Sequence, residues 1–279
     1  MAFPGGGLIP QPYHHMMLIN APRMASFRFA IDQVVKPGMT VLEAGAGTGV
    51  LSALAARAGA GHVYAIELDP DLAAVARRTA ALNGLAERIT VVEGRAEDFV
   101  PPTPVDVVIC EMLHVGLVNE QQVGVMRAVM GALAARQDVS KVAVIPCAAV
   151  SAVQLMAVDY RYVELEIPLV RSNNPYVEDP RLTPLSEPVP YWVCDLACPQ
   201  TRVDVTVSLV AAQAGRVNAI QLITKAVMTR ALDHPLNDWY LFQLQLPMPP
   251  RDVVAGETLA LRLAYDAGCP IEAMTLAWA

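Results

Sequence analysis

In the first half of the chain, short apolar runs alternate with alanine-rich stretches that have helical periodicity. Five apolar runs precede Pro146, and they cover residues 40–43, 62–67, 89–93, 105–110 and 141–145. Strands that alternate with helices form parallel sheets, because each parallel connection has to cross back over a face of the sheet. This half is therefore predicted to be an α/β unit with a parallel-rich sheet and helices on both faces.

The pattern changes near Pro146. The strand-like runs that follow it are separated by proline and glycine, with few helical stretches, and they cover residues 202–211, 219–229, 240–246 and 258–265. This texture predicts a mostly antiparallel β unit, either a barrel or a sandwich. We place the domains at residues 1–146 and 147–279. The apolar segment 142–158 is interrupted by Pro146, and its small and β-branched residues favour two buried strands over a membrane span.

Composition excludes several classes of protein. Of the 279 residues, 54% are hydrophobic and 17% are charged, which excludes a disordered chain. The net charge of −7 argues against a nucleic-acid partner. The N-terminus lacks a basic segment before an apolar run, so we expect a cytoplasmic protein without a membrane anchor. The cysteines lack the paired spacing of a metal site, so no metal is predicted; they are Cys110, Cys147, Cys194, Cys198 and Cys269.

A glycine loop follows the first predicted strand. Gly45, Gly47 and Gly49 let the backbone turn tightly and approach a ligand, and the helix that follows offers unpaired N–H groups. A dinucleotide fingerprint would need its third glycine at position 50, where the chain has valine. A nucleotide-like ligand is expected, therefore, with a pyrophosphate disfavoured. Glu67, at the end of the second strand, is expected to accept hydrogen bonds from ribose hydroxyls in either cofactor class.

These motifs resemble the class I S-adenosyl-L-methionine-dependent methyltransferases. Over nearly the whole chain they are similar to the protein arginine methyltransferases, whose catalytic unit is a Rossmann-like domain followed by a β-barrel. The resemblance implies S-adenosylmethionine as cofactor and a cofactor-covering helix between His14 and Arg28, in which Arg23 would pair with the methionyl carboxylate. Residues 93–98 resemble the adenine-contacting turn. The cofactor-binding residues that the resemblance implies are Met17, Arg23, Glu43, Gly45, Gly47, Gly49, Glu67, Leu68, Ala96, Glu97 and Glu111.

Two glutamates follow the fourth predicted strand. Glu111 and Glu120 are nine positions apart, which resembles the family's double-glutamate loop that grips the substrate guanidinium. Independently of the family, carboxylates at the carboxyl end of a parallel strand lie where such sheets bind ligands, and two of them can hold a planar cation. We therefore expect N-methylation of a guanidine-like acceptor, on a protein or a small molecule.

Several residues depart from the family pattern. Met112 replaces the aromatic residue after the first glutamate, and residues 5–13 show no clear counterpart of the family's tyrosine motif. Asp238 replaces the histidine of the Thr-His-Trp loop and is expected to add negative potential, while Trp239 is expected to form a wall of the acceptor pocket. His114 is the histidine that we select as a candidate base.

The sequence leaves oligomeric state and acceptor open. The family's dimerisation arm would fall around residues 169–190, where this chain is short and rich in proline, so a homodimer built through that arm is disfavoured. The stretch itself is an ordered excursion or a loop. The alternatives to a guanidine acceptor are a small apolar or phenolic metabolite, a non-catalytic cofactor-binding module and, least favoured, a nicotinamide-dependent oxidoreductase.

Overall fold

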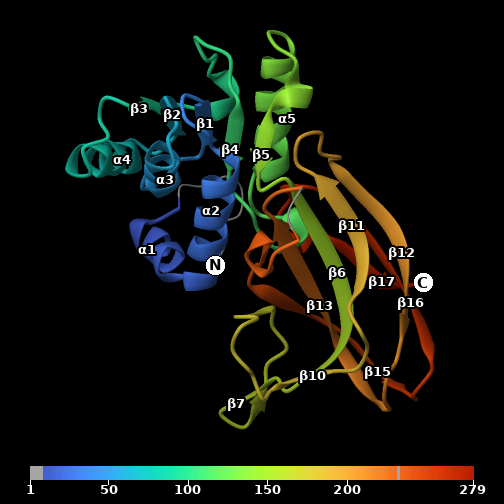
Figure 1. Cartoon of the computed structure of the whole chain (residues 1–279). Coiled ribbons are helices and arrows are strands. Elements are labelled where there is room, and N and C mark those ends of the chain that lie inside the picture. Colours follow the sequence, from blue (N-terminus) through green and yellow to red (C-terminus); the bar gives the residue numbers. More distant parts are fainter. Residues whose placement is uncertain (1–8, 231–232) are drawn as a thin grey trace.

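The computed structural model describes residues 9–230 and 233–279 of the chain (Figure 1). Residues before Pro146 build a five-stranded parallel sheet in the order β3-β2-β1-β4-β5. The strands are β1 (Thr40–Ala44), β2 (His62–Glu67), β3 (Ile89–Glu93), β4 (Val107–Cys110) and β5 (Ala143–Ile145). The predicted parallel sheet is thereby confirmed. Its order reverses between β1 and β4, and ligands of such sheets bind at that point, beyond the carboxyl ends of the strands.

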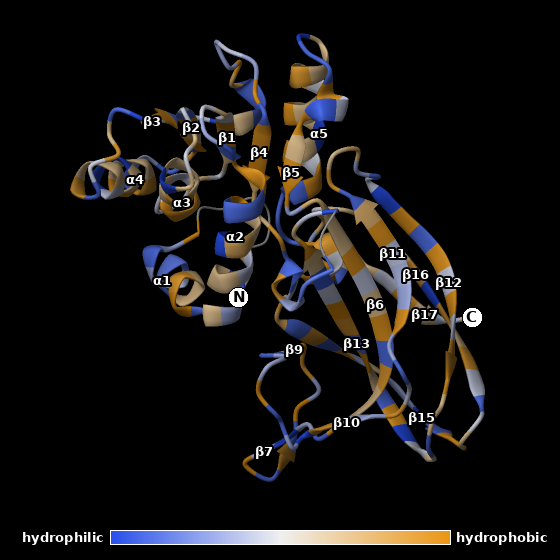
Figure 2. Cartoon of the chain, in the orientation of Figure 1, coloured by the Kyte–Doolittle hydropathy of each residue, from blue (hydrophilic) through white to orange (hydrophobic). Residues whose placement is uncertain are grey.

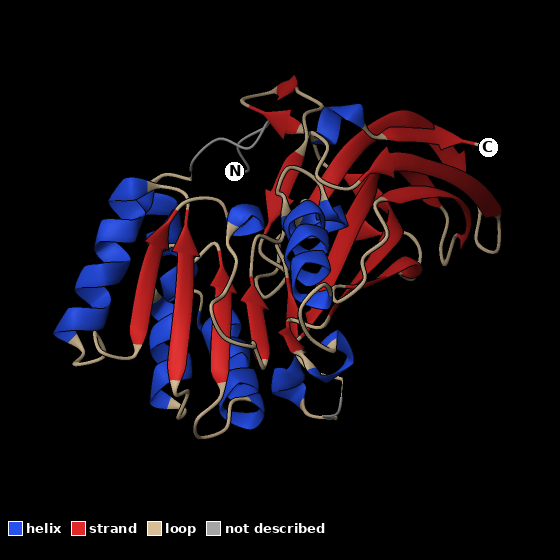
Figure 3. Ribbon diagram, turned by 90° about the horizontal axis from the view of Figure 1, so that it is seen from above, coloured by secondary structure: helices blue, strands red, loops and turns tan. Residues whose placement is uncertain are grey.

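Helices cover this sheet, and the antiparallel part lies beyond its β5 edge (Figure 3). The helices are α1 (Gln11–Ile19), α2 (Ala21–Val34), α3 (Val50–Arg57), α4 (Pro70–Leu82) and α5 (Gln122–Ala134). Short 3₁₀ turns are η1 (Ala96–Asp98), η2 (Val115–Leu117) and η3 (Val139–Lys141). The single cofactor-covering helix that we expected is two helices, because Asn20 ends α1 and caps α2 by accepting a hydrogen bond from the Arg23 N–H. In the described part of the chain, no helix has both the length and the apolar character needed to cross a membrane.

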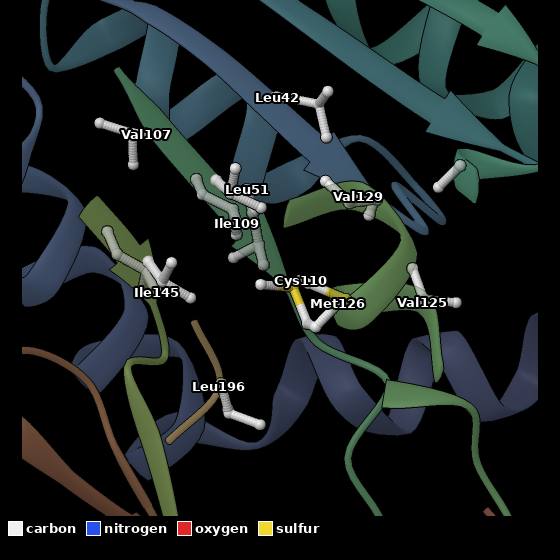
Figure 4. Close-up of a cluster of buried hydrophobic side chains, with 14 of the residues drawn as sticks. Leu42, Leu51, Val107, Ile109, Cys110, Val125, Met126, Val129, Ile145 and Leu196 are labelled. Atoms are coloured by element: carbon white, nitrogen blue, oxygen red, sulfur yellow. The ribbon is translucent and has the colours of Figure 1, made fainter. Parts of the chain in front are cut away.

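One hydrophobic cluster joins the sheet to the rest of the molecule. Leu42, Ile109 and Ile145 from the strands meet Met126 of α5, and Leu196 from the C-terminal half packs into the same cluster (Figure 4). The central strands of the sheet are accordingly among the apolar segments in Figure 2. Full burial of one such aliphatic side chain stabilises the fold by about 1.5–3 kcal/mol. This shared cluster fixes the sheet against the C-terminal half.

The C-terminal half is antiparallel, as predicted. A seven-stranded sheet contains β6 (Ala148–Val158), β9 (Arg171–Asn173), β10 (Leu182–Pro184), β11 (Val189–Asp195), β13 (Gly215–Val227), β14 (Asp238–Tyr240) and β15 (Gln243–Val253). A three-stranded sheet contains β12 (Arg202–Val210), β16 (Thr258–Asp266) and β17 (Thr275–Trp278). The turn η4 (Pro235–Asn237) lies between β13 and β14, and η5 (Ile271–Ala273) lies between β16 and β17. Side chains of both sheets form a second hydrophobic cluster. Strand pairing changes from parallel to antiparallel between β5 and β6, beside Pro146.

The proline-rich stretch is an ordered excursion. The hairpin of β7 (Arg161–Tyr162) and β8 (Leu165–Glu166) precedes it, and within it β9 pairs with β15 and β10 pairs with β6. These pairings tie the excursion to both sides of the seven-stranded sheet, which decides between the two interpretations that composition left open.

Candidate active site

A cavity of about 430 Å³ lies at the carboxyl ends of the parallel strands, beside the switch point between β1 and β4. Every predicted cofactor-binding residue except Gly49 lines it, and Glu120 and Met112 line it as well. The fold thus brings together residues from α1, α2, the glycine loop, the end of β2, η1 and the loop after β4. This position is where sheets of this topology hold their ligands.

The glycine loop is tied to the end of β2. The Gly47 N–H donates a hydrogen bond of 2.6 Å to Oε2 of Glu67, whose Oε1 accepts from the Asp69 N–H at 2.9 Å. Gly47 has a φ of 52°, in the left-handed region that favours glycine. A Cβ at this residue would lie 2.9 Å from Cε1 of His14, so the glycine also permits the close approach of α1.

Gly49 has a packing role between two helices. It does not line the cavity; it precedes α3 with a φ of 75°, and a Cβ there would lie 3.0 Å from the Cβ of Ala76 in α4. Its lack of a side chain lets α3 and α4 pack closely, and its assignment as a cofactor contact stays a prediction.

Two residues of α1 were missed by the sequence analysis. His14 lines the cavity, burial lowers its pKa, and among the described residues its buried Nε2 has no hydrogen-bond partner. Burial, followed by the charges of Glu120 and Glu111, raises the pKa of Tyr13 to about 12, which places this phenol near both glutamates. The sequence feature that could have identified them is their position in the same N-terminal segment as Arg23.

Arg23 is buried beside the first glutamate. Only 5% of Arg23 is exposed, and its Nη2 forms an ion pair with Oε2 of Glu111. Its guanidinium carbon lies 5.2 Å from the centre of the Phe27 ring and 5.8 Å from that of Trp239, within cation–π range. Trp239 is not among the residues that line the cavity, so the structure shows its contact with Arg23, while its role as a wall of the acceptor pocket stays a prediction.

Arg23 retains a donor for a ligand. Its Nε is buried and has no partner among the described residues, although Nη1 donates to the Met17 carbonyl at 3.4 Å. The resemblance implied a cofactor carboxylate as the partner of Arg23, whereas its partner in this structure is Glu111. The unpaired Nε–H fits a carboxylate that enters the cavity, so one guanidinium can bridge Glu111 and a cofactor.

The two glutamates differ in electrostatic surroundings. Glu111 is neutralised by Arg23, and its end of the loop is fixed by Gln122, which accepts from the Met112 N–H at 2.7 Å and donates to the Cys110 carbonyl at 2.9 Å. Glu120 has no ion-pair partner in the described part of the chain. Burial, reinforced by the charge of Glu111, raises the pKa of Glu120 to about 8. The cavity therefore contains a partly buried carboxyl group that a bound cation would stabilise in its ionised form.

Asp238 and His114 are not among the residues that line the cavity. Oδ2 of Asp238 is 2.7 Å from Nζ of Lys225, and the negative potential expected from Asp238 stays a prediction. The Lys225 ammonium offsets that charge locally. Burial lowers the pKa of His114 to about 4. This position does not favour His114 as the base.

The residues around the cavity fit S-adenosylmethionine. Gly47 permits a close approach of the ligand, Glu67 and Glu97 offer carboxylate acceptors on either side, and Arg23 offers a buried donor. Glu97 is itself oriented by Arg95, whose Nη2 is 2.5 Å from Oε1 of Glu97. A ribose, an adenine amino group and a carboxylate are the ligand groups that these donors and acceptors match.

Comparisons with known sequences agree with this assignment. A family model described as a methyltransferase domain matches residues 41–136. An uncharacterized protein of Methanocaldococcus jannaschii is 36% identical over 148 residues, which are 53% of this chain and 55% of that protein. An arginine N(omega)-methyltransferase of Streptomyces achromogenes subsp. streptozoticus is 36% identical over 113 residues, which are 39% of this chain and 31% of that protein.

The sequence matches are partial. A probable histone-arginine methyltransferase of Arabidopsis thaliana is 49% identical over 85 residues, which are 30% of this chain and 16% of that protein. The aligned part of the chain thus spans between 16% and 55% of the length of these curated relatives.

The structural matches extend over nearly the whole chain. The PRMT1 enzyme–prozyme complex of Trypanosoma brucei has a TM-score of 0.75 at 18% identity and covers 96% of both chains. The protein arginine methyltransferase 10 of Arabidopsis thaliana has a TM-score of 0.73 at 19% identity, covering 91% of this chain and 87% of that one. At these identities the likeness establishes the fold. Residues 41–136 therefore form a class I methyltransferase domain, whose cofactor is S-adenosylmethionine, in a chain that resembles the protein arginine methyltransferases in its fold.

Proposed function

We propose that the chain methylates a nitrogen of a guanidine-like acceptor. The observation that carries this proposal is Glu120, a partly buried carboxyl group that shares the cavity with Glu111 and has no counter-ion among the described residues. A planar guanidinium, with five N–H donors, is the side-chain cation best suited to two carboxylates. The names of the Streptomyces and Arabidopsis relatives, which refer to arginine methylation in those proteins, favour the same acceptor.

The cavity residues divide the work of this reaction. Bound S-adenosylmethionine supplies an electrophilic methyl group on sulfur. Arg23 holds Glu111 and offers Nε to the cofactor's carboxylate, so it fixes the acceptor-binding Glu111 relative to the cofactor. Glu111 and Glu120 orient the guanidinium and draw its positive charge away from the nitrogen that attacks. With the cofactor bound, the bond from that nitrogen to the methyl carbon would form as the methyl–sulfur bond breaks, leaving the cofactor's sulfur as a neutral thioether. The nitrogen would lose a proton, which Glu120, with a raised pKa and held ionised by the bound cation, is suited to accept.

The test is methyl transfer from labelled S-adenosylmethionine to three acceptors: free arginine, an arginine-rich peptide and a whole cell extract. We expect labelled methylarginine, and we expect Glu120→Gln to lower kcat/KM for the acceptor by about 10²-fold or more while the Kd of the cofactor changes less than twofold. The matched control is Glu87→Gln, an exposed glutamate outside the cavity. Glu111→Gln is less informative, because it also releases Arg23.

Other outcomes select the alternatives. Label confined to phenolic or apolar small molecules would replace the guanidine acceptor with a metabolite. Cofactor binding without transfer to any fraction would favour a non-catalytic module. Undiminished transfer by Glu120→Gln would contradict the carboxylate grip.

In contrast to the expectation from the shortness of residues 169–190, we infer from exposed apolar side chains that the excursion between β6 and β11 mediates self-association. Its exposed apolar side chains include Val163, which is 94% exposed, and Leu165, which is 64% exposed, with Ile167, Leu169 and Val170 close in sequence. Exposed apolar groups concentrated in one segment are typical of protein–protein interfaces, and an identical chain is the partner always present at the same concentration. The solved complex of the Trypanosoma relative is titled a heterotetramer, which favours assembly.

Light scattering after gel filtration tests this inference. We expect the wild-type chain to have the mass of a dimer or a larger assembly, and Leu165→Asp to shift it toward the monomer. The control is Leu82→Asp, which alters an equally prominent exposed leucine at the end of α4. A monomeric wild type at every concentration would overturn the inference.

A further inference from the structure

The loop that carries Glu120 is fastened to the turn between β16 and β17. The Asn119 N–H donates to the Cys269 carbonyl at 2.7 Å, and the Ile271 N–H donates to Oδ1 of Asn119 at 2.9 Å. The Gly268 N–H donates to the Leu117 carbonyl at 2.8 Å. Three hydrogen bonds thus connect this short loop to a turn about 150 residues later in the chain.

These bonds hold a backbone conformation that the loop would not favour alone. Leu117 has a φ of 55° and Asn119 a φ of 63°, both in the left-handed region. Leucine is uncommon there, and asparagine is among the more tolerant residues. Such a conformation persists when surrounding contacts require it. Since Glu120 follows Asn119 directly, the φ of Asn119 determines the direction in which the chain presents the Glu120 carboxylate.

A second contact fixes the start of the same loop. The Tyr265 hydroxyl donates to the Gly116 carbonyl at 2.9 Å, and the Gly116 N–H donates to Oγ1 of Thr224 at 2.7 Å. Tyr265 and Thr224 lie in β16 and β13, on the antiparallel side of the molecule. Glu111, in contrast, is held by Arg23 and by the contacts of Gln122, all from the methyltransferase side. The two glutamates are therefore supported from different halves of the chain.

We propose that Asn119 is a positioning residue through which the β16–β17 turn sets the place of the Glu120 carboxylate, so that acceptor binding depends on the Ile271 N–H. This proposal rests on the proposed function of Glu120 as an acceptor ligand. Asn119 acts through its neighbour: its side-chain oxygen is occupied by the Ile271 N–H, and its backbone N–H by Cys269. Cofactor binding should not depend on this clamp, because Arg23, Gly47 and Glu67 are supported elsewhere.

The chain offers a substitution that removes the clamp without altering a cavity residue. Ile271→Pro eliminates the N–H that donates to Asn119. Proline is compatible with this position because Ile271 begins the short turn η5, and because Pro270 has a ψ of 144°, in the extended region allowed before proline. Ile271→Ala is the matched control, since it loses the aliphatic side chain but keeps the N–H. The difference between the two variants therefore isolates the hydrogen bond.

Two measurements on the full chain test the proposal. Steady-state kinetics with the best acceptor found for the wild type should show an acceptor KM about tenfold higher for Ile271→Pro than for Ile271→Ala, with a cofactor Kd that agrees within twofold. Hydrogen exchange should be faster in peptides that cover residues 115–121 in Ile271→Pro only. A merely structural role would lower thermal stability without this split between acceptor KM and cofactor Kd.

The outcomes separate this proposal from the proposed function. Equal acceptor KM and equal loop exchange in the two variants would overturn the clamp. If wild-type protein transfers no methyl group to any guanidine, the proposed function fails, and hydrogen exchange still decides whether the turn holds the loop. If Ile271→Pro does not fold, Asn119→Gly replaces it, because it removes the Oδ1 that accepts the hydrogen bond from the Ile271 N–H. Glycine also suits the φ of 63° at this position. The same rise in acceptor KM is expected, measured relative to wild type.

Discussion

Gly47 is the residue at which three parts of the site meet. Its N–H is bound to Glu67, its φ is left-handed, and its Cα faces the His14 ring of α1. In Gly47→Ala the new methyl group would stand 2.9 Å from Cε1 of His14, so the His14 ring, which lines the cavity, has to move. We expect the affinity for S-adenosylmethionine to fall at least tenfold, measured by titration calorimetry.

The control for this substitution is Gly84→Ala. Gly84 also has a left-handed φ, 68°, but a Cβ there would meet no atom within 4 Å. It therefore carries the backbone cost of about 1 kcal/mol without a contact near the ligand. Equal cofactor affinity in the two alanine variants would mean that the close approach of His14 has no part in binding.

Trp239 provides a second prediction for a single side chain. Its ring and that of Phe27 flank the buried guanidinium of Arg23, and a cation–π contact of this kind contributes about 0.5–2 kcal/mol. We expect Trp239→Leu to weaken cofactor binding several-fold more than Trp239→Phe does, because phenylalanine keeps an aromatic face. Titration calorimetry compares the cofactor affinities of the two variants, after circular dichroism has verified that both are folded. Identical affinities for the two variants would count against the cation–π contact.

The site residues show what the sequence could and could not predict. Glu67 ends one apolar run and Glu111 directly follows another, so their place at the ends of parallel strands could be inferred from the local pattern, whereas Glu120 was found only by its spacing from Glu111. The partner of Asp238 could not be inferred, because Lys225 reaches it only through the pairing of β13 with β14. Tertiary contacts of this kind leave no trace in the spacing of residues along one segment.

Among the elements, α1 has a distinctive relation to the cavity. None of its residues is buried, yet His14, Met17 and Leu18 line the cavity. A nine-residue helix is too short to be stable in isolation, and with little buried surface it depends on what it covers. We expect slow hydrogen exchange in residues 11–19 only when S-adenosylmethionine is bound.

Mass spectrometry of exchanged peptides measures this effect. The internal control is the second half of α5, around Met130 and Leu133, which are buried in the shared hydrophobic cluster. Its protection should be the same with and without cofactor. Protection of α1 that is already complete without cofactor would show that the helix is a fixed wall rather than a cover formed on binding.

The elements themselves were largely predictable, and the exceptions have local causes. All five strands of the parallel sheet coincide with apolar runs, because both faces of such a sheet are buried. The run 240–246 instead divides between β14 and β15, where the Leu241 N–H donates to the Thr224 carbonyl. The division between α1 and α2 had a signal, since Asn20 with Pro22 two residues later is the pattern of a helix start.

At the scale of the whole molecule, the cavity imposes a cost on stability. The net charge of −7 counts every acidic group as ionised, but burial raises the pKa of both Glu43 and Glu120 from 4.5 to about 8. The folded chain therefore binds protons more tightly than the unfolded chain between these two pKa values. By linkage, these groups lower the free energy of unfolding as pH rises from about 4.5 to 8, and the penalty is fully present above pH 8.

Glu120→Gln removes one of these titrations and so predicts a stability difference that depends on pH. Since glutamine stays neutral, the free energy of unfolding of the variant relative to that of wild type should increase from pH 5.5 to pH 8.5, by on the order of 2 kcal/mol. Urea unfolding of wild type and variant at pH 5.5 and 8.5, without cofactor, measures this change in relative stability. Glu87→Gln should show no change in stability relative to wild type between the two pH values. A difference that is constant with pH would mean that Glu120 titrates alike in the folded and unfolded chains. A difference that grows with pH would mean that ionisation of Glu120 lowers the free energy of unfolding. The carboxylate that we assign to acceptor binding would then destabilise the chain when no acceptor is bound, and a bound guanidinium should restore the lost stability.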